Sequence, residues 1–170
     1  MFNRFKLYWQ DIRTVAALNT EAERQAHLGG EQLPGAEHYL LSALSLEEGS
    51  ARRALQRVGA DPEGFRAAIS EQYASTLEKM GLDAGLAGEA PPPVSDKKAL
   101  FNAQPSGQAL MRALPDLRKA TKATPLCGAH VLLAIARMPH SVAARALKTM
   151  GVDCQAVARA AEAELAMMAS

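Results

Sequence analysis

Histidine and cysteine are the residue types in this chain best suited to acid–base, nucleophilic or metal chemistry. His38 and His130 each stand just before a Leu-Leu pair, at the expected start of a helix, where a partly buried histidine bonded to backbone is the usual outcome. His27 and His140 have no carboxylate or cysteine at metal-ligand spacing. We therefore expect structural roles for the first two, surface positions for the other two, and no metal or cofactor.

The two cysteines, Cys127 and Cys154, are too few for a disulfide scaffold and lack the paired spacing of a zinc site. Neither has a basic neighbour placed to lower the pKa of its thiol. We expect both to be small buried or half-buried residues in a reducing cytosol. No catalytic residue is predicted, and the chain is not expected to be an enzyme.

Composition excludes several classes of partner. Hydrophobic residues make up 48% and charged residues 22%, which is typical of a globular protein, and the net charge of +1 gives no electrostatic signature of nucleic-acid binding. The cluster Arg112, Arg118, Lys119 and Lys122 is interpreted as a solvated helix surface. No apolar run is long enough to span a bilayer, and Asn3, Arg4 and Lys6 would interrupt a signal peptide. We expect a soluble cytoplasmic protein that binds neither nucleic acid nor membrane.

The elements that hold these residues are duplicated. Residues 36–69 and 128–161 align without a gap, in a register that superposes His38 on His130. A repeat this long indicates one supersecondary unit built twice. Gly59 and Gly151 occupy the same position in the two copies, and each is expected to end a helix in the left-handed conformation. Asp61 and Asp153 also correspond, and each is expected to be the N-cap of the helix that follows.

Apolar residues recur at intervals of three and four and β-branched residues are sparse, so the chain is predicted to be all-α. The expected helices are 12–28, 36–46, 50–58, 62–80, 105–120, 128–138, 141–150 and 154–167. We predict two tandem four-helix repeats, 12–80 and 105–170, related by a pseudo-twofold axis in one eight-helix globule. An aromatic extension, 1–11, precedes them, and a linker, 81–104, whose three prolines forbid helix, joins them.

Three strings in each unit resemble the repeat of the Clp amino-terminal domain, G-T-E-H-L-L-L, G-V-A-A-x-x-L and L-G-V-D. They are GAEHYLL at 35–41, SARRAL at 50–55 and VGAD at 58–61, then HVLL at 130–133, VAARAL at 142–147 and MGVD at 150–153. The similarity covers about residues 12–166. It implies an all-helical, two-repeat module that normally precedes the ATPase rings of Clp unfoldases and binds substrates, adaptors and, in some members, phosphorylated arginine or cyclic peptides.

The chain departs from family members in features that they use to bind nucleotides or phosphoarginine. No G-x-x-x-x-G-K-[ST] loop is present to cradle nucleotide phosphates. Glu37 matches an acidic residue that helps family members recognise phosphoarginine, but Ala129 stands at its position in the second repeat. Any such recognition would be confined to one half-site. Glu37 is equally suited to a role at a helix N-terminus, where the macrodipole stabilises a carboxylate.

Aromatic residues gather at the amino terminus, in Phe2, Phe5, Tyr8 and Trp9. They are interpreted either as an anchor for a partner or as an extra helical turn docked on the protein's own core. The best candidates for a recognition surface are Glu37, Phe2, Phe5 and Trp9, the segment 97–104 with Phe101, and the groove between repeats.

These observations favour a non-enzymatic protein- or peptide-binding module that acts as an adaptor, decoy or regulator of Clp-dependent proteolysis. Its partner would be a Clp unfoldase, an adaptor or a degradation substrate. Two alternatives remain: a receptor that sequesters a cyclic peptide or similar small molecule, and a receptor for a partner helix resembling the amino-terminal domain of the type VI secretion unfoldase ClpV.

Overall fold

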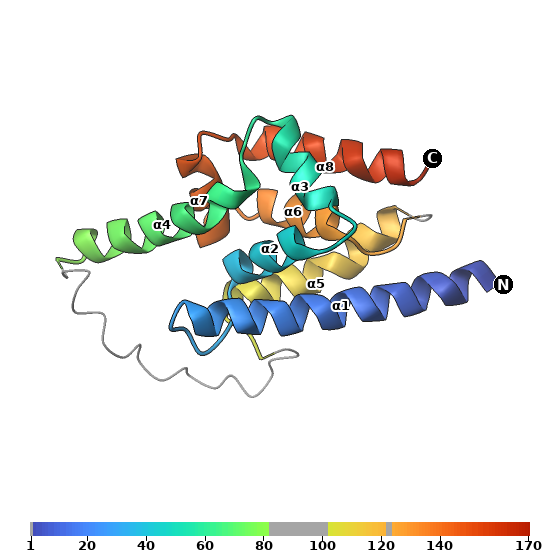
Figure 1. Cartoon of the computed structure of the whole chain (residues 1–170), viewed down its shortest axis with the longest axis horizontal. Coiled ribbons are helices and arrows are strands. Elements are labelled where there is room, and N and C mark those ends of the chain that lie inside the picture. The colour runs from blue at the N-terminus through green and yellow to red at the C-terminus, as the bar shows by residue number, and fades with distance from the viewer. Residues whose placement is uncertain (1, 82–101, 122–123) are drawn as a thin grey trace.

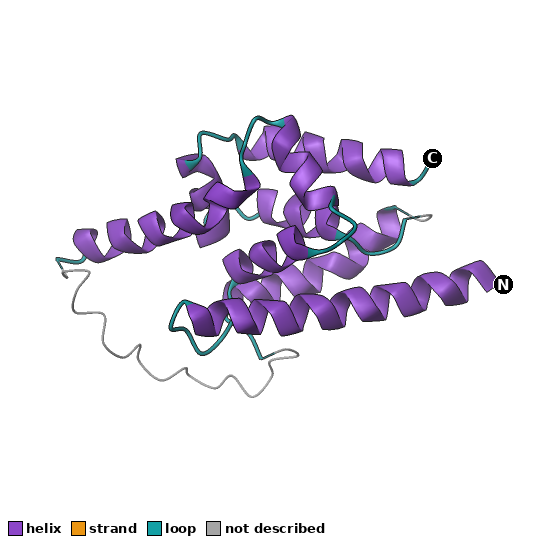
Figure 2. Cartoon of the chain, in the orientation of Figure 1, coloured by secondary structure: helices purple, strands orange, loops and turns teal. Residues whose placement is uncertain are grey.

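The computed structural model describes residues 2–81, 102–121 and 124–170, and every regular element in those ranges is helical (Figures 1 and 2). The elements are α1 Phe2–Leu28, α2 Ala36–Ser45, α3 Ser50–Arg57, the 3-10 turn η1 Pro62–Gly64, α4 Phe65–Lys79, α5 Pro105–Ala120, α6 Gly128–Ala136, α7 Val142–Thr149 and α8 Cys154–Met168. The prediction of an all-α fold is confirmed.

The duplicated stop and start signals act as predicted. Gly59 and Gly151 follow α3 and α7 with φ of 75° and 78°, the left-handed conformation that glycine adopts without steric cost. Asp61 and Asp153 then accept hydrogen bonds from backbone N–H groups two and three residues further along, at 3.1 and 3.0 Å. These local features are the same in both halves of the chain.

Two elements differ from their predicted extents by more than two residues, and the other helix boundaries agree within that margin. The helix expected to begin at Ile12 begins at Phe2 instead, because no proline or glycine interrupts residues 2–28. The helix expected over 62–80 is divided into η1 and α4, with Gly64 at the junction. The aromatic extension is therefore continuous with the first helix of the chain.

The two halves interlock around a shared core. Helices α2 and α6 lie at the centre and contact each other, while α3 packs on α8 and α7 packs on α4. Leu40 of α2 and Leu132 and Ile135 of α6 are fully buried there. The halves also differ, since α8 packs along α6 whereas α4 barely contacts α2 and projects from the body (Figure 1). A pseudo-twofold axis stays a prediction.

The first N–H groups of both central helices are satisfied by the opposite half. The Ala36 N–H of α2 donates to Oγ of Ser106 at 3.1 Å, and the Gly128 N–H of α6 donates to Oε1 of Glu48 at 2.7 Å. A Cβ at Gly128 would lie 2.9 Å from the Cβ of Ala51. The glycine therefore permits α6 to approach α3 closely.

Most of the predicted linker 81–104 lies outside the described residues. Where the description resumes, Ala103 is buried and the Gln104 N–H donates to the carbonyl of Pro34 at 3.0 Å.

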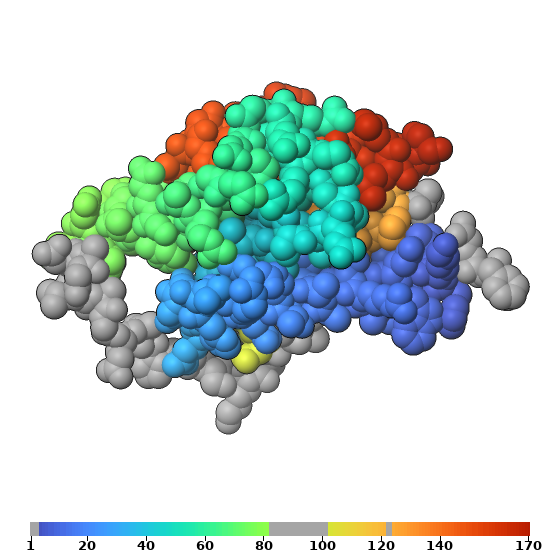
Figure 3. Space-filling model, viewed as in Figure 1, coloured from blue at the N-terminus to red at the C-terminus, as the bar shows by residue number. Residues whose placement is uncertain are grey.

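In the space-filling view, α1 runs along one edge of the molecule below α2 and α3 (Figure 3). No helix in the described ranges is both long enough and apolar enough to cross a membrane.

Candidate functional site

The two equivalent histidines are buried and bonded to backbone at the starts of α2 and α6. Each lies at the third position of its helix and accepts a backbone N–H at Nδ1, from Gly35 to His38 at 3.0 Å and from Cys127 to His130 at 3.2 Å. Their exposed fractions are 4% and 0%. Because Nδ1 accepts, the ring proton of each neutral imidazole resides on Nε2. The predicted role of a buried, backbone-bonded histidine is confirmed, and His27 and His140 are exposed as expected.

Cys127 and His130 come within 3.2 Å of each other, between Sγ and Nδ1. Burial raises the pKa of the Cys127 thiol. Burial, aided by the charge of Arg118, lowers the pKa of His130 to about 4. Both shifts favour the neutral thiol and the neutral imidazole over a thiolate–imidazolium pair. Cys154 is also buried, and its burial raises the pKa of its thiol.

Glu37 does not lie on the open surface. Its side chain is 1% exposed, and its Oε1 accepts a hydrogen bond from the hydroxyl of Tyr73 at 2.6 Å. Burial and the charge of Glu37 raise the pKa of Tyr73, so the tyrosine stays a donor. Its other oxygen, Oε2, is buried without a hydrogen-bond partner. At the matching position of α6, Ala129 is fully buried.

Glu31, Glu37 and His38 place potential ligand atoms within 4.8 Å of one another, which is the spacing of a cation site. His38 cannot complete such a site in this arrangement. Its Nδ1 lone pair accepts the Gly35 N–H, and its Nε2 carries a proton and lies 3.9 Å from Oε1 of Glu31. A metal ligand needs a bare nitrogen lone pair. The cluster is therefore better described as a buried polar junction between α2 and the loop before it.

The predicted aromatic recognition residues separate into two groups. Phe5, Tyr8 and Trp9 are 65%, 61% and 50% exposed on α1, so these three side chains do not dock on the protein's core. Phe2 begins α1, but its side chain lies outside the described part of the chain, as does Phe101. The structure does not bring Glu37 together with the exposed aromatics.

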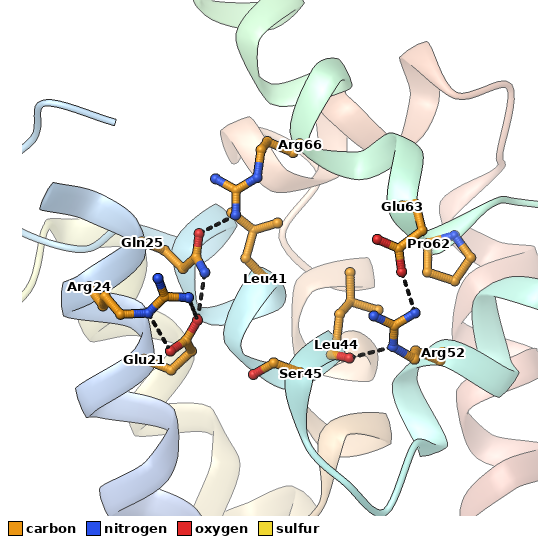
Figure 4. A pocket seen from close by; sticks show the side chains of 10 residues that line it. All are labelled: Glu21, Arg24, Gln25, Leu41, Leu44, Ser45, Arg52, Pro62, Glu63 and Arg66. Atoms are coloured by element: carbon orange, nitrogen blue, oxygen red, sulfur yellow. Dashed lines mark hydrogen bonds and ion pairs between the residues drawn. The ribbon is translucent and has the colours of Figure 1, made fainter. Parts of the chain in front are cut away.

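A groove of about 180 Å³ opens over α2, between α1, α3 and the start of α4 (Figure 4). Leu41 and Leu44 of α2 line it together with Pro62 of η1. Its polar rim consists of Glu21, Arg24, Gln25, Ser45, Arg52, Glu63 and Arg66. The groove lies where α4 diverges from α2 and makes few contacts with it.

Two of the rim arginines are neutralised by carboxylates. Arg24 donates to both oxygens of Glu21 at 2.8 and 2.6 Å, and these bonds hold the pKa of that carboxyl below its usual value against the opposing effect of burial. Arg52 donates to Glu63 at 2.6 Å and to the Leu44 carbonyl at 2.7 Å. Both guanidinium groups are thereby fixed in orientation at the rim (Figure 4).

Arg66 is the exception at this rim. Its guanidinium donates to the side-chain oxygen of Gln25, a neutral amide, and it forms no ion pair with any carboxylate of the described residues. Gln25 is held in turn, because its Nε2 donates to Glu21 at 2.5 Å. The groove therefore presents a positioned cation beside Leu41, and the charge of Arg66 also helps to lower the pKa of Glu21, whose carboxylate is bonded to Arg24.

A second, more apolar groove of about 560 Å³ lies among α5, α6 and α8. Leu117, Leu133 and Leu165 line it with several alanines, and Arg137 and Glu162 form an exposed pair 3.6 Å apart at its rim. Neither groove is predicted from the sequence, because the residues of each come from segments that are separated in the chain. The groove that the sequence analysis does predict lies between the repeats, and its residues are not specified there.

Comparison with known proteins assigns no family: no protein-family model matches this chain, and no curated protein matches it significantly.

Proposed function

We propose that this chain is a non-enzymatic protein- or peptide-binding module similar to the Clp amino-terminal domain. It would act as an adaptor, decoy or regulator whose partner is a Clp unfoldase, an adaptor or a degradation substrate. The observation that carries the proposal is Arg66, a cation held by Gln25 above Leu41 and Leu44 without a carboxylate of its own.

The groove suits a peptide segment that carries an acidic group beside an apolar side chain. A carboxylate of the partner would accept charge-assisted hydrogen bonds from Arg66. The apolar side chain would cover Leu41, which is partly exposed, and remove it from water. The rim pairs Arg24–Glu21 and Arg52–Glu63 are already balanced in charge, so they would attract a partner's carboxylate less strongly than Arg66 does.

Two further features support a binding role without chemistry. The buried Cys127 and His130 are both favoured in their neutral forms, which disfavours a reactive thiolate–imidazolium pair. Both cysteines are free, which accords with a reducing compartment, and we place the protein in the cytoplasm.

The test is affinity capture from the cells that produce the protein, using the wild type and two charge-reversed variants as bait. Arg66→Glu should reduce recovery of the partner about tenfold to a hundredfold, because a hydrogen-bonded charge is replaced by a repulsive one. Arg145→Glu is the matched control, since Arg145 is also exposed but lies on α7 outside the groove. Equal recovery by both variants, or recovery of no Clp component, adaptor or degradation substrate, would refute the proposal.

The apolar groove among α5, α6 and α8 favours a second candidate, a receptor for a partner's amphipathic helix. Its volume of about 560 Å³ and its leucine and alanine lining match the apolar face of such a helix. Ala166→Glu, at an exposed lining position of α8, should abolish capture if this groove is the site and leave it unchanged if the Arg66 groove is.

A further inference from the structure

The amino-terminal half of α1 carries an apolar stripe that no other part of the described chain covers. Phe5, Tyr8, Trp9 and Ile12 follow the i, i+3, i+4, i+7 spacing that places side chains on one helix face, and they are 65%, 61%, 50% and 40% exposed. Phe5 and Trp9 meet edge to face with ring centroids 6.0 Å apart. Tyr8 and Trp9 are similarly arranged at 6.5 Å. The three rings therefore form one continuous surface.

Cations flank this stripe on both sides. Arg4, Lys6 and Arg13 are all exposed, and at 100° per residue Arg4 falls on one side of the stripe while the other two fall on the other side. None of them forms an ion pair with a described residue. The only carboxylate in this half of α1, Asp11, faces inward and is neutralised by Arg118 at 2.9 Å.

We propose that this half of α1 is an interfacial anchor that lies flat on an anionic lipid bilayer. Helices of this kind carry aromatic residues on one face and lysine or arginine beside it, so that the rings enter the headgroup region while the cations contact phosphates. Trp and Tyr suit that depth because each combines an apolar ring with a polar tip. The anchor lies on the membrane without spanning it, and this proposal replaces the sequence-based expectation of no membrane partner.

Charge also argues against a second copy of the chain as the occupant of the stripe. Pairing two such faces would bring two sets of Arg4, Lys6 and Arg13 together with no carboxylate to balance them. An anionic leaflet supplies the missing negative charge. The position of the stripe permits this contact, since the amino-terminal end of α1 extends to the edge of the molecule (Figures 1 and 3).

The chain carries its own probe, because Trp9 is its single tryptophan. Phosphatidylcholine vesicles containing phosphatidylglycerol should shift the Trp9 emission to shorter wavelength and carry the full chain into the vesicle pellet. Pure phosphatidylcholine should do so much more weakly. Each cation near an anionic surface strengthens binding about fivefold, so the variant Arg4→Gln/Lys6→Gln/Arg13→Gln should bind about a hundredfold more weakly.

A second variant, Phe5→Ser/Tyr8→Ser, removes part of the stripe and keeps the probe. It should lose vesicle binding while its circular dichroism and melting temperature stay close to those of the wild type, since both side chains are exposed. Leu28→Ser is the matched control, because Leu28 is 65% exposed at the opposite end of α1. It should bind as the wild type does.

Three results would overturn the proposal. The first is an unchanged Trp9 emission with the protein remaining in the supernatant. The second is a shift that depends on protein concentration without vesicles, which would identify a second copy as the occupant. The third is vesicle binding that the Phe5→Ser/Tyr8→Ser variant retains, which would assign the contact to another face.

Discussion

Arg53 of α3 donates from Nε to Oε2 of Glu164 on α8 across 2.7 Å, so an ion pair joins the first half of the chain to its last helix. Arg57 donates to the other oxygen of the same carboxylate at 2.6 Å. Glu164 is 1% exposed, whereas both arginines are close to half exposed. The carboxylate is therefore the buried member, and its desolvation is offset by two charge-assisted hydrogen bonds.

Glu164→Gln should lower the free energy of unfolding by about 1–3 kcal/mol, because it leaves two guanidinium groups without their charged acceptor. Urea titration of wild type and variant measures the difference. Glu162→Gln, on the same helix, is the control: its pair with Arg137 is exposed and 3.6 Å apart, so its loss should cost about 0.5 kcal/mol or less. Equal effects of the two substitutions would contradict this account.

The stability of the protein should also fall at low pH because of Glu164. Burial acts to raise the pKa of Glu164, but the hydrogen bonds from Arg53 and Arg57 outweigh it and hold that pKa below the usual 4.5. The unfolded chain therefore binds this proton first as the pH falls. The stabilisation is complete above pH 4.5 and is lost below it. Glu164→Gln should show a smaller drop in melting temperature below that pH than the wild type does.

The glycines that follow the C-terminal ends of α3 and α7 provide a paired test of backbone strain. Gly59→Ala and Gly151→Ala should each reduce stability by about 1 kcal/mol or more, because φ near +75° is unfavourable for a residue with a Cβ. A Cβ added at either glycine would have no neighbouring atom within 4 Å, so the loss would be conformational rather than steric. Thermal unfolding measures it.

Gly64→Ala is the matched control for these two glycines. Gly64 has φ of −72°, and a Cβ there would meet only the Met150 methyl at an ordinary contact distance of 3.7 Å. Its replacement should leave stability unchanged or raise it by about 0.5 kcal/mol, since alanine restricts the unfolded chain. A loss at Gly64 as large as that at Gly59 would show that the left-handed conformation is not the cause.

His130 should make stability depend on pH in a higher range than Glu164 does. Its folded pKa of about 4 lies below the usual 6.5, so the unfolded state binds more protons between those values. Its contribution is complete above pH 6.5 and is lost as the pH falls toward 4, by about 3 kcal/mol in total. Urea titrations of wild type and His130→Asn across this range should show a flatter dependence in the variant. An unchanged slope would be inconsistent with a buried neutral imidazole.

The features of this fold that could be predicted are those that act between residues close together in the sequence. Gly59, Gly151, Asp61 and Asp153 act through φ angles and through hydrogen bonds to neighbouring residues, so their roles follow from adjacent sequence. The start of α1 follows less directly from the sequence. Asp11, just ahead of the predicted start at Ile12, lies inside α1, and its carboxylate accepts from Arg118 and from the Leu126 N–H. Partners so distant in the chain leave no local pattern.

Hydrophobic spacing and capping act over a few residues, so most of the helices, their duplicated ends and the burial of His38 and His130 could be predicted from the sequence. The sites depend instead on packing between distant helices. Packing buried Glu37 beneath Tyr73, placed Arg66 above α2 without a carboxylate, and left the stripe at Phe5 and neighbouring residues uncovered. Each outcome depends on which distant helix lies alongside: α8 packs along α6, whereas α4 makes few contacts with α2.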